Sequence, residues 1–472
     1  MIGITGYGVY IPFYKLDRAA IGSFWGGGRP PGEKAVANFD EDSVTMAVEA
    51  CRNCLADMPP KKTGALYLSS TSLPYAEKQN AVFVATALDL EKQTFTSDIT
   101  GSLRAGTNGL LQAMAQCHGK DDPALVVASD TRLAKPFGNK EMSLGDGAAA
   151  LAVGSQDVIA AIEQTHSSYE DIYDTYRVSG SPYLQDWDER FARDSGYIRT
   201  MTTGIREALE KWHMQPAEFQ KLVISAANPG YLKKPLKTLG FDFKQQQAQD
   251  PLFGAVGFTG AAHPFLLLCA ALENAAPGER ILFAAYGDGC DVFSLKTTDA
   301  IAGFQKSQKM QTLLQDRQAV TYQKYLRWKN LVEMEPAKRP KQEAASSVAL
   351  YRDQKCGMAF NGSKCRNCGT IQYPVQRICM NCRTKDDFEY YSFADQKGQI
   401  TTFSHDFLAV TPDPPATLAA VDFEAGGRVM LDITDREPDA VHIGMPVVPT
   451  FRKFRLTEGI QVYWWKAKPL KK

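Results

Sequence analysis

Four cysteines near the C-terminus have the spacing of a metal site. Cys365 and Cys368 form one C-x2-C pair, and Cys379 and Cys382 form a second pair after ten intervening residues. A two-residue gap lets both sulfurs of a pair face one ion, and two such pairs give four thiolates around Zn²⁺. Free or disulfide-bonded cysteines are the alternative, but soft thiolate ligands favour zinc. Four thiolates leave no open coordination position, so we predict that this zinc is structural and not catalytic.

The composition is that of a globular protein with two or three domains. The 472 residues are 44% hydrophobic and 22% charged, and Lys+Arg and Asp+Glu each number 53. The net charge is therefore zero, and no overall electrostatic attraction favours binding to nucleic acid or to an anionic membrane. The first residues lack the pattern of a signal peptide, and no apolar run approaches the ~18 residues of a membrane span. The six other cysteines are interpreted as reduced thiols of a cytoplasmic protein: Cys51, Cys54, Cys117, Cys269, Cys290 and Cys356.

Residues 1–300 alternate short apolar runs with amphipathic helical stretches. The runs at 65–70, 124–130, 221–228 and 281–289 predict buried strands, and 42–55 and 80–90 predict helices, the first led by Asp40, Asp42 and Ser43. This alternation implies an α/β layered fold. The segment GDGAAALAVG (145–154) is echoed by YGDGCDVFSL (286–295), which favours two related halves.

The remaining third of the chain has a different character. We predict a helical connector and a Pro- and Lys-rich linker over 301–350, a rubredoxin-like zinc ribbon over 351–390, and an all-β barrel over 391–472. The tail WWKAKPLKK (464–472) is basic and aromatic, as are the nearby residues Arg452, Lys453 and Arg455. We expect this tail to be solvated, with contact to CoA phosphates or nucleic acid as the alternative.

Ordered motifs in residues 1–300 resemble hydroxymethylglutaryl-CoA synthase, particularly its archaeal form, in the thiolase superfamily. They are GYGVYIPFYKLDR (6–18), LPYAEK (73–78), AGT (105–107), GDGAAA (145–150), the segment around Asn228, and YGDG (286–289). The resemblance implies a thiolase-like duplicated layered fold, with helices around two parallel or mixed sheets, and dimerisation through this domain. A coenzyme A thioester is the ligand that it implies.

The C-terminal residues resemble a second family, a zinc ribbon joined to an OB-fold that accompanies thiolase-like proteins. The resemblance lies in CRNCGTIQYPVQRICMNC (365–382), HDFLAVTPDPPATLAAVDF (405–423) and HIGMPVVPTF (442–451). In related systems a thiolase, a synthase and the zinc/OB protein assemble. The implied partner of this chain is therefore a thiolase-type subunit that carries the cysteine nucleophile.

The residues that the synthase family needs for catalysis are replaced. The cysteine nucleophile matches Leu103 in GSLRAGT, the glutamate acid/base matches Thr71 in SSTSLPY, and the histidine matches Ser225 in ISAANPG. Asn228 is retained, whereas the later Gly-Asn turn is replaced by FGAVGFTG (253–260). Leucine cannot form a thioester, so we assign no catalytic residue and leave open whether the pocket still binds CoA.

Other candidate residues have weaker cases. Ser102 adjoins Leu103 but is favoured as a turn or helix-cap serine, and Cys290 is either an acid/base near the pocket or a small buried residue. Cys117 and His118 are adjacent on a helix and so do not face each other. We interpret His263 as a helix-start residue.

Two main functional hypotheses follow. The first is a catalytically degenerate synthase-like subunit that acts as structural or regulatory partner of a thiolase-type acyl-CoA enzyme. The second is an active acyl-CoA synthase or acyltransferase that works without a covalent acyl intermediate. OB-folds also bind single-stranded nucleic acid, but the zero net charge and the synthase-like domain disfavour that function.

Overall fold

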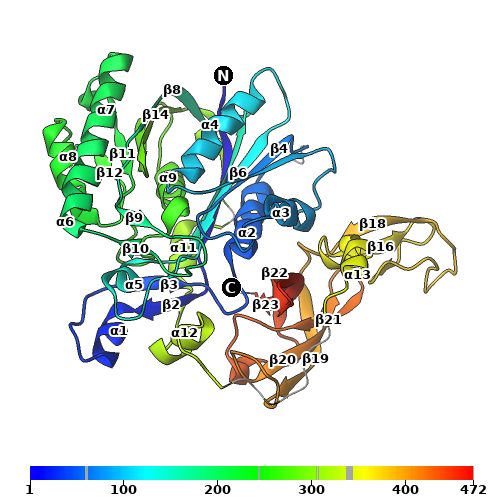
Figure 1. The fold of residues 1–472 in the computed structure, drawn as a ribbon. Coiled ribbons are helices and arrows are strands. Elements are labelled where there is room, and N and C mark those ends of the chain that lie inside the picture. The colour runs from blue at the N-terminus through cyan, green and yellow to red at the C-terminus, as the bar shows by residue number, and fades with distance from the viewer. Residues whose placement is uncertain are drawn as a thin grey trace. The chain divides into compact units, whose positions relative to one another are not determined.

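A computed structural model describes residues 1–58, 62–242, 245–304, 306, 308–335, 338 and 344–470. The chain divides into two compact units (Figure 1). Unit 1 holds residues 1–37, 42–82 and 90–331, and unit 2 holds 38–41, 83–89 and 332–472. The domain boundaries predicted from sequence remain predictions. Most of the predicted linker between 336 and 343 lies outside the described residues.

Unit 1 is built on a ten-stranded mixed sheet. Its strands are hydrogen-bonded in the order β12-β11-β13-β14-β8-β1-β7-β6-β4-β5. The bounds are β1 (Gly3–Tyr10), β4 (Ala65–Ser69), β5 (Phe95–Ile99), β6 (Ala124–Asp130), β7 (Gly147–Gly154), β8 (Ala160–Tyr169), β11 (Lys221–Ile224), β12 (Gln247–Ala248), β13 (Arg280–Tyr286) and β14 (Gly289–Thr297). All four predicted strand segments are present.

The sheet consists of two halves with the same topology. In the first half β1 and β7 are antiparallel, β7 and β6 are antiparallel, and β6, β4 and β5 are parallel. In the second half β8, β14, β13, β11 and β12 repeat this pattern. The two echoing sequence segments form β7 and β14, which occupy equivalent places. The predicted duplicated α/β fold is therefore confirmed.

Helices pack on both halves of the sheet. Helix α4 (Ala105–Cys117) contacts β4 and β6, and α7 (Arg199–Trp212) contacts β8 and β14. Helix α2 (Ser43–Ala56) contacts β1 and β7, and it begins where the Asp42 carboxylate accepts hydrogen bonds from the backbone N–H groups of Val44 and Thr45. Helix α9 (His263–Glu273) is buried over nearly its whole length in the central core.

Shorter elements complete unit 1. They are β2 (Tyr14–Asp17), α1 (Arg18–Phe24), β3 (Glu33–Val36), α5 (Asn139–Ser143), β9 (Thr175–Tyr176), β10 (Gln185–Asp186), α6 (Glu189–Phe191), α8 (Lys233–Thr238), α10 (Ala300–Gly303), α11 (Met310–Gln315), β15 (Gln318–Ala319) and α12 (Tyr322–Trp328). The expected helical pattern after residue 300 is present in α10, α11 and α12. These helices belong to unit 1, because β15 pairs with β2 in a small sheet.

Unit 2 combines a ribbon and an all-β barrel. The ribbon contains β16 (Asn361–Cys365), β17 (Ile371–Gln372) and β18 (Phe388–Ser392). The barrel sheet has the order β21-β20-β19-β22-β23. Its strands are β19 (Gly398–Asp406), β20 (Ala416–Phe423), β21 (Arg428–Asp432), β22 (Pro446–Thr457) and β23 (Ile460–Pro469). Unit 2 also contains helices α13 (Ser347–Arg352) and α14 (Gln354–Gly357), together with most of α3 (Ala81–Ala87), because residues 83–89 belong to this unit. The predicted zinc ribbon and OB-fold are thus present.

The prediction of a solvated tail is wrong for residues 464–469. These residues form part of β23, which pairs with β22 along its length. Trp465 and Ala467 are each only 1% exposed, and the Trp465 ring stacks on Phe360. Because alternate side chains of this strand fill the barrel core, the tail is structural.

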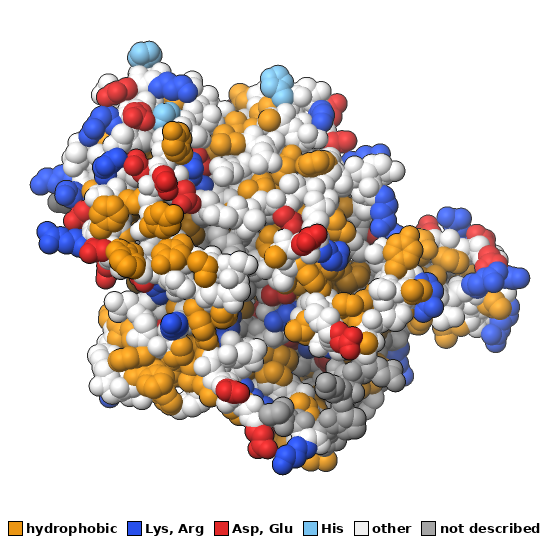
Figure 2. All heavy atoms as spheres, viewed as in Figure 1, with side chains coloured by type: hydrophobic (Ala, Val, Ile, Leu, Met, Phe, Trp, Pro, Cys, Tyr) orange, Lys and Arg blue, Asp and Glu red, His pale blue; other side chains and the backbone are white. Residues whose placement is uncertain are grey.

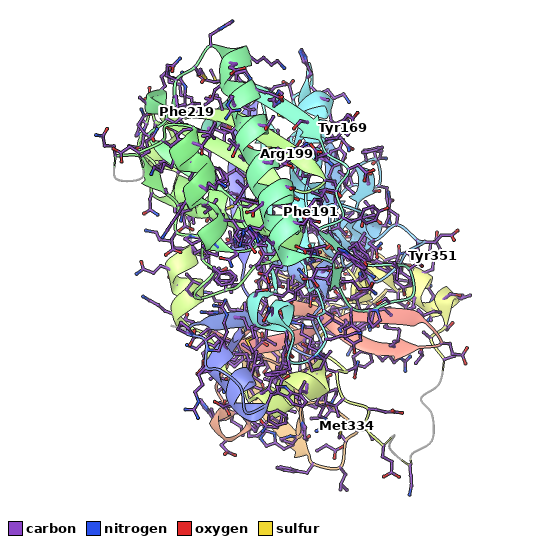
Figure 3. All side chains as sticks on the ribbon, turned by 60° about the vertical axis from the view of Figure 1, so that its left-hand side comes forward. Tyr169, Phe191, Arg199, Phe219, Met334 and Tyr351 are labelled. Carbon is purple, nitrogen blue, oxygen red and sulfur yellow. The ribbon has the colours of Figure 1, made fainter. Side chains whose placement is uncertain are left out.

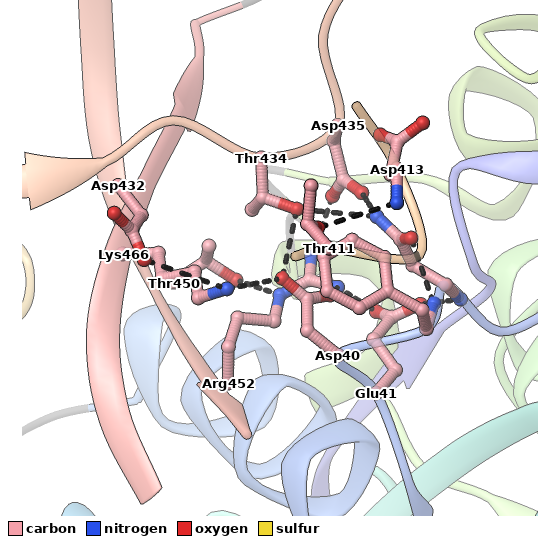
Figure 4. Close-up of polar contacts among 12 residues, drawn as sticks. Asp40, Glu41, Thr411, Asp413, Asp432, Thr434, Asp435, Thr450, Arg452 and Lys466 are labelled. Carbon is pink, nitrogen blue, oxygen red and sulfur yellow. Dashed lines mark hydrogen bonds and ion pairs between the residues drawn. The ribbon is translucent and has the colours of Figure 1, made fainter. Parts of the chain in front are cut away.

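A buried charge cluster lies in unit 2 (Figure 4). The Arg452 guanidinium is fully buried and forms ion pairs with Glu41 and Asp435 at 2.5 Å and with Asp40 at 3.4 Å. Lys466 forms an ion pair with Asp40 at 3.0 Å. A buried charge is tolerated only when opposite charges and hydrogen bonds compensate it, so this cluster ties residues 38–41 into unit 2.

Among the described residues, no helix has the length and apolar character needed to cross a membrane.

Candidate functional site

Unit 1 contains a cavity of about 630 Å³. Its lining includes residues at the ends of strands and helices: Leu103 just before α4, Arg132 just after β6, Ser225 just after β11, and Tyr286 at the end of β13. Ligands of α/β sheets commonly bind where the carboxyl ends of strands leave such space. The cavity is therefore the candidate functional site.

Leu103 lines this cavity, whereas Ser102 is not among the lining residues. The Ser102 hydroxyl donates a hydrogen bond to the Gly287 carbonyl oxygen at 3.1 Å and accepts one from the backbone N–H of Arg104 at 3.3 Å. The Arg104 guanidinium in turn pairs with the buried Asp291 at 2.9 Å. These contacts hold the turn so that it presents an apolar side chain to the cavity, in agreement with the interpretation of Ser102 as a turn residue.

Thr71 is not among the lining residues. Its hydroxyl donates to Asp130 Oδ2 at 2.9 Å, and its backbone N–H donates to Asp130 Oδ1 at 2.7 Å. Asp130 also accepts hydrogen bonds from Ser70, Ser72 and the backbone of Ala261. Thr71 is thus part of the hydrogen-bond network around the buried Asp130 carboxylate.

Ser225 and Asn228 both line the cavity. The Ser225 carbonyl oxygen accepts a hydrogen bond from the Tyr197 hydroxyl at 2.8 Å. The Asn228 side-chain oxygen accepts from the backbone N–H of Gly230 at 2.9 Å, which caps a short 3-10 turn. Three residues of the FGAVGFTG segment, Phe253, Gly254 and Phe258, also form part of the wall. The structure therefore brings Leu103, Ser225 and Asn228 to one site.

The remaining thiol and imidazole candidates are not among the lining residues. Cys290 is fully buried against Gly204, and burial raises the pKa of its thiol. Cys117 is buried at the end of α4, and His118, the residue that follows the helix, is exposed, so the two side chains do not face each other. His263 is the first residue of α9, as predicted, and burial lowers its pKa to about 4. The described lining residues include neither a cysteine nor a histidine.

Polar cavity residues that the sequence reasoning missed are Arg132, Asp174 and Tyr286. Burial raises the pKa of the Tyr286 hydroxyl, and the nearby Asp174 raises it further, so Tyr286 stays protonated. Burial lowers the pKa of Arg132, whereas Asp130 and Asp174 oppose that effect. The sequence could have indicated Arg132 as a cavity residue, because it lies two residues after a predicted buried strand.

Gly260 leaves room for the Arg132 side chain because it has no Cβ atom. Gly260 has a φ of +61°, and a Cβ there would lie 2.7 Å from Arg132 Cδ and 2.2 Å from Asp130 Oδ2. Any larger residue would be strained and would displace both side chains. Gly260 therefore lets the arginine reach the cavity beside the Asp130 network.

The four predicted metal ligands lie together in unit 2. The sulfur atoms of Cys365, Cys368, Cys379 and Cys382 all lie within 4.8 Å of one another. Two Sγ–Sγ distances are 3.6 Å, for Cys365 and Cys382, and 3.5 Å, for Cys368 and Cys379. Tetrahedral zinc with Zn–S bonds of about 2.3 Å separates its sulfurs by roughly 3.8 Å. The donor set and its size therefore fit Zn²⁺.

The two C-x2-C pairs sit in matching backbone turns. The backbone N–H of Cys365 donates to the Thr370 carbonyl oxygen, and that of Cys379 donates to the Thr384 carbonyl oxygen, both at 2.9 Å. Hydrogen bonding between Cys382 and the side chain and backbone of Thr384 lowers the pKa of Cys382 to about 5. A thiol ionised in this way is ready to bind a cation.

Comparison with known proteins shows close relatives of most of the chain. Hydroxymethylglutaryl-CoA synthase of Methanopyrus kandleri is 32% identical over 341 residues, which are 70% of this chain and 97% of that protein. The synthase of Methanocaldococcus jannaschii is 32% identical over 348 residues, 71% of this chain and the whole of that protein.

Solved structures and family models agree with the fold. An HMG-CoA synthase complexed with CoA has a TM-score of 0.62 at 18% identity, and it covers 69% of this chain and 89% of its own. PksG, an HMG-CoA synthase from Bacillus subtilis, has a TM-score of 0.63 at 21% identity, with coverage of 70% and 89%. The ChsH2 rubredoxin-like zinc ribbon domain matches residues 360–389, and the ChsH2 C-terminal OB-fold domain matches 392–452.

Proposed function

Because the chain belongs to the hydroxymethylglutaryl-CoA synthase family, we propose that it is a catalytically degenerate member that serves as the structural or regulatory partner of a thiolase-type acyl-CoA enzyme. One observation carries the proposal: Leu103 lines the cavity, and neither a cysteine nor a histidine is among its described lining residues. Covalent acyl transfer needs an activated nucleophile and a proton acceptor beside it. The partner would supply both.

The zinc ribbon and OB-fold would dock the thiolase-type subunit. Cys365, Cys368, Cys379 and Cys382 would hold a structural Zn²⁺ that keeps the ribbon folded. Between β19 and β20, Phe407, Leu408 and Val410 are exposed. Consecutive exposed apolar side chains are typical of protein interaction sites.

Unit 1 also has apolar surface that suits association, including the predicted dimerisation. Figure 2 shows hydrophobic side chains gathered over the part of unit 1 that carries α1 and α12, where Phe24, Trp25 and Phe137 are exposed. Figure 3 shows two further exposed aromatic residues, Tyr169 at the end of β8 and Phe191 in the helix that continues into α7.

A direct assay tests the proposal. The chain would be purified alone and together with a thiolase-type subunit from the same organism. Each sample would be incubated with a β-ketoacyl-CoA plus CoA, and with acetyl-CoA plus acetoacetyl-CoA. We expect turnover only in the presence of the thiolase, and co-elution of the two proteins. Robust turnover by the chain alone would contradict the proposal.

An acyl-CoA enzyme without a covalent intermediate is the second candidate. The cavity retains Asn228 and also contains Asp174 and the protonated Tyr286, which could move protons on a bound carbonyl compound. Turnover by the lone chain that Asp174→Asn abolishes would favour this function over the first.

A further inference from the structure

Residues 169–191 of unit 1 form an exposed aromatic surface, which we call the rim. Its most exposed aromatic side chains are Tyr169, Tyr173, Trp187 and Phe191, of which Tyr169 is 88% and Trp187 is 81% exposed. Figure 2 shows hydrophobic side chains gathered over β9, β10 and α6, which all lie within the rim. Exposed aromatic side chains that gather in one place are typical of protein interaction sites.

The rim is also acidic. It contains six acidic and two basic side chains, although the whole chain has a net charge of zero. Asp171, Asp188 and Glu189 are exposed, and none of them forms an ion pair with another described residue. Asp186 is exposed as well, but it pairs with Lys140 at 3.2 Å. The carboxylates that are left without a cation favour a partner with a basic surface.

A basic surface lies next to the rim on the same unit. Helix α8 carries Lys233, Lys234 and Lys237, which are all exposed and form no ion pair with another described residue. The hydroxyl of Tyr231, two residues before α8, donates to Glu189 Oε1 at 3.4 Å. Figure 1 shows α6 and α8 as neighbours. An acidic surface and a basic surface therefore lie side by side.

Two copies of such a surface complement each other. A two-fold axis that passes between the rim and α8 would place the rim of each copy against α8 of the other, so both charged contacts form together. The aromatic side chains of the rim would then be buried, and buried tryptophan and tyrosine contribute most to binding. The charges would fix the orientation of the two copies. A second copy of this chain is therefore the partner that fits.

We propose that unit 1 associates with a second copy of this chain through the rim, with the exposed carboxylates of each rim facing the lysines of α8 in the other copy. Asp186 and Glu189 are exposed and also line the cavity. The second copy would therefore cover the cavity where it meets solvent and contribute its α8 lysines to the border of the site. This inference goes beyond the proposed function and does not depend on it, because it requires neither a thiolase nor a reaction.

The test is the molar mass of the full-length chain, measured by analytical ultracentrifugation over a range of concentrations. We expect wild type to double its mass with increasing concentration, and Trp187→Ala to raise the dissociation constant of that step about 10- to 100-fold, because a buried tryptophan is lost. The matched control is Tyr351→Ala, since Tyr351 is 77% exposed but lies in unit 2. Its dissociation constant should stay within about 2-fold of the wild-type value.

Charge reversal gives a sharper test. Asp171→Lys with Glu189→Lys reverses the rim, and Lys233→Glu with Lys237→Glu reverses α8. Each double variant should lose the association, because like charges then face each other. An equimolar mixture of the two double variants should regain the doubled mass, because opposite charges meet again at both contacts.

Lys92→Glu with Lys120→Glu is the charge-matched control, because both lysines are exposed in unit 1 outside the rim and α8. It should associate as wild type does. If a reversed variant does not fold, Trp187→Ala and Tyr351→Ala still decide.

The proposal is overturned if wild type does not associate, if Trp187→Ala associates as tightly as wild type does, or if the mixture of folded reversed variants does not regain the doubled mass. These outcomes are separate from the turnover assay of the proposed function, because they are measured without a second protein and without a substrate.

Discussion

The two units of this chain use reactive residue types in opposite ways. In unit 1, a duplicated sheet and buried helices enclose a cavity, yet Leu103 stands where the resemblance places a cysteine. In unit 2, four cysteines form one cluster and buried charges form another, and the pocket beside the cysteines has a volume of only about 10 Å³. The potentially reactive thiols and charges of unit 2 therefore serve its stability.

The difference shows how each unit is stabilised. The hydrophobic core of unit 1 extends over both halves of its sheet and includes residues 265–272 of α9. A large core of this kind tolerates the replacement of surface and cavity residues. The zinc ribbon of unit 2 is small, so we expect a bound metal to provide much of its stability. The buried ion pairs lie in the adjoining barrel. Substitutions should therefore affect the two units very differently.

The largest effect should follow from removing zinc or one of its ligands. We expect the purified chain to contain about one zinc per polypeptide, and Cys365→Ser or a chelator to unfold the ribbon, because structural zinc contributes on the order of 10 kcal/mol. Metal analysis and hydrogen exchange would measure both effects. Unit 1 should keep its protection from exchange.

Cys356→Ser is the matched control for this experiment, because Cys356 lies in unit 2 but outside the four-sulfur cluster. It should retain the metal and the exchange pattern. Absence of zinc in a chain with intact thiols, or loss of structure in both units together, would contradict the prediction.

A smaller but still large effect should follow from Arg452→Met. This change leaves Asp40, Glu41 and Asp435 buried without their shared partner, so we expect unit 2 to lose about 3–5 kcal/mol of stability. Denaturant unfolding would measure the loss. Arg428→Met is the control, because its pair with Asp422 is exposed to solvent and should contribute little to stability. Equal losses in the two variants would show that the buried cluster is not a major stabiliser.

The two units should also respond to acid over different pH ranges. Burial lowers the pKa of His263 in unit 1 to about 4, below its unfolded value of about 6.5. The unfolded state therefore binds the proton first, and unit 1 should lose about 3 kcal/mol as pH falls from about 6.5 to 4. His263→Gln should abolish most of this slope in hydrogen exchange measured across that range.

The barrel of unit 2 should instead lose stability below about pH 4. Burial alone would raise the pKa of Asp40, but the positive charges of Lys466 and Arg452 outweigh it and lower that pKa. A carboxylate with a lowered pKa stabilises the fold above its unfolded pKa, and this contribution is lost as pH falls through the folded value. A loss of protection in the barrel strands already at pH 6 would contradict this assignment.

The smallest effect should come from restoring the nucleophile alone. Leu103→Cys places a thiol in the cavity, but the lining still lacks a histidine to activate it. We expect no acetyl adduct after incubation with acetyl-CoA, measured by intact mass, and no turnover. Cys290→Ser should likewise produce neither an adduct nor turnover, because that thiol is buried and is not among the residues that line the cavity. Rapid acetylation of the introduced thiol would show that the cavity keeps more of its chemistry than we propose.

Local patterns were enough to predict the main elements. Asp42 caps α2, and the echoing segments form β7 and β14, because capping and strand alternation depend on near neighbours in the sequence. The four cysteines form a cluster for the same reason, since two local turns bring each pair together.

Long-range contacts could not be predicted in this way. Arg132 and Tyr286 line one cavity although about 150 residues separate them in sequence. The tail was misjudged because Lys466 and Arg452 have a solvated composition, and only their pairing with Asp40 and Asp435 makes them buried. Charge compensation across hundreds of residues leaves no periodic signal in the sequence.

The assembly of unit 2 from three stretches of chain has a practical consequence. A truncated protein that begins near residue 332 would contain the ribbon and every barrel strand, yet it would lack Asp40 and Glu41. Its Arg452 would lose two of the three carboxylates that neutralise it. A C-terminal fragment that is made for fusion to another protein or for crystallography therefore requires either residues 38–41 or a neutral replacement for Arg452.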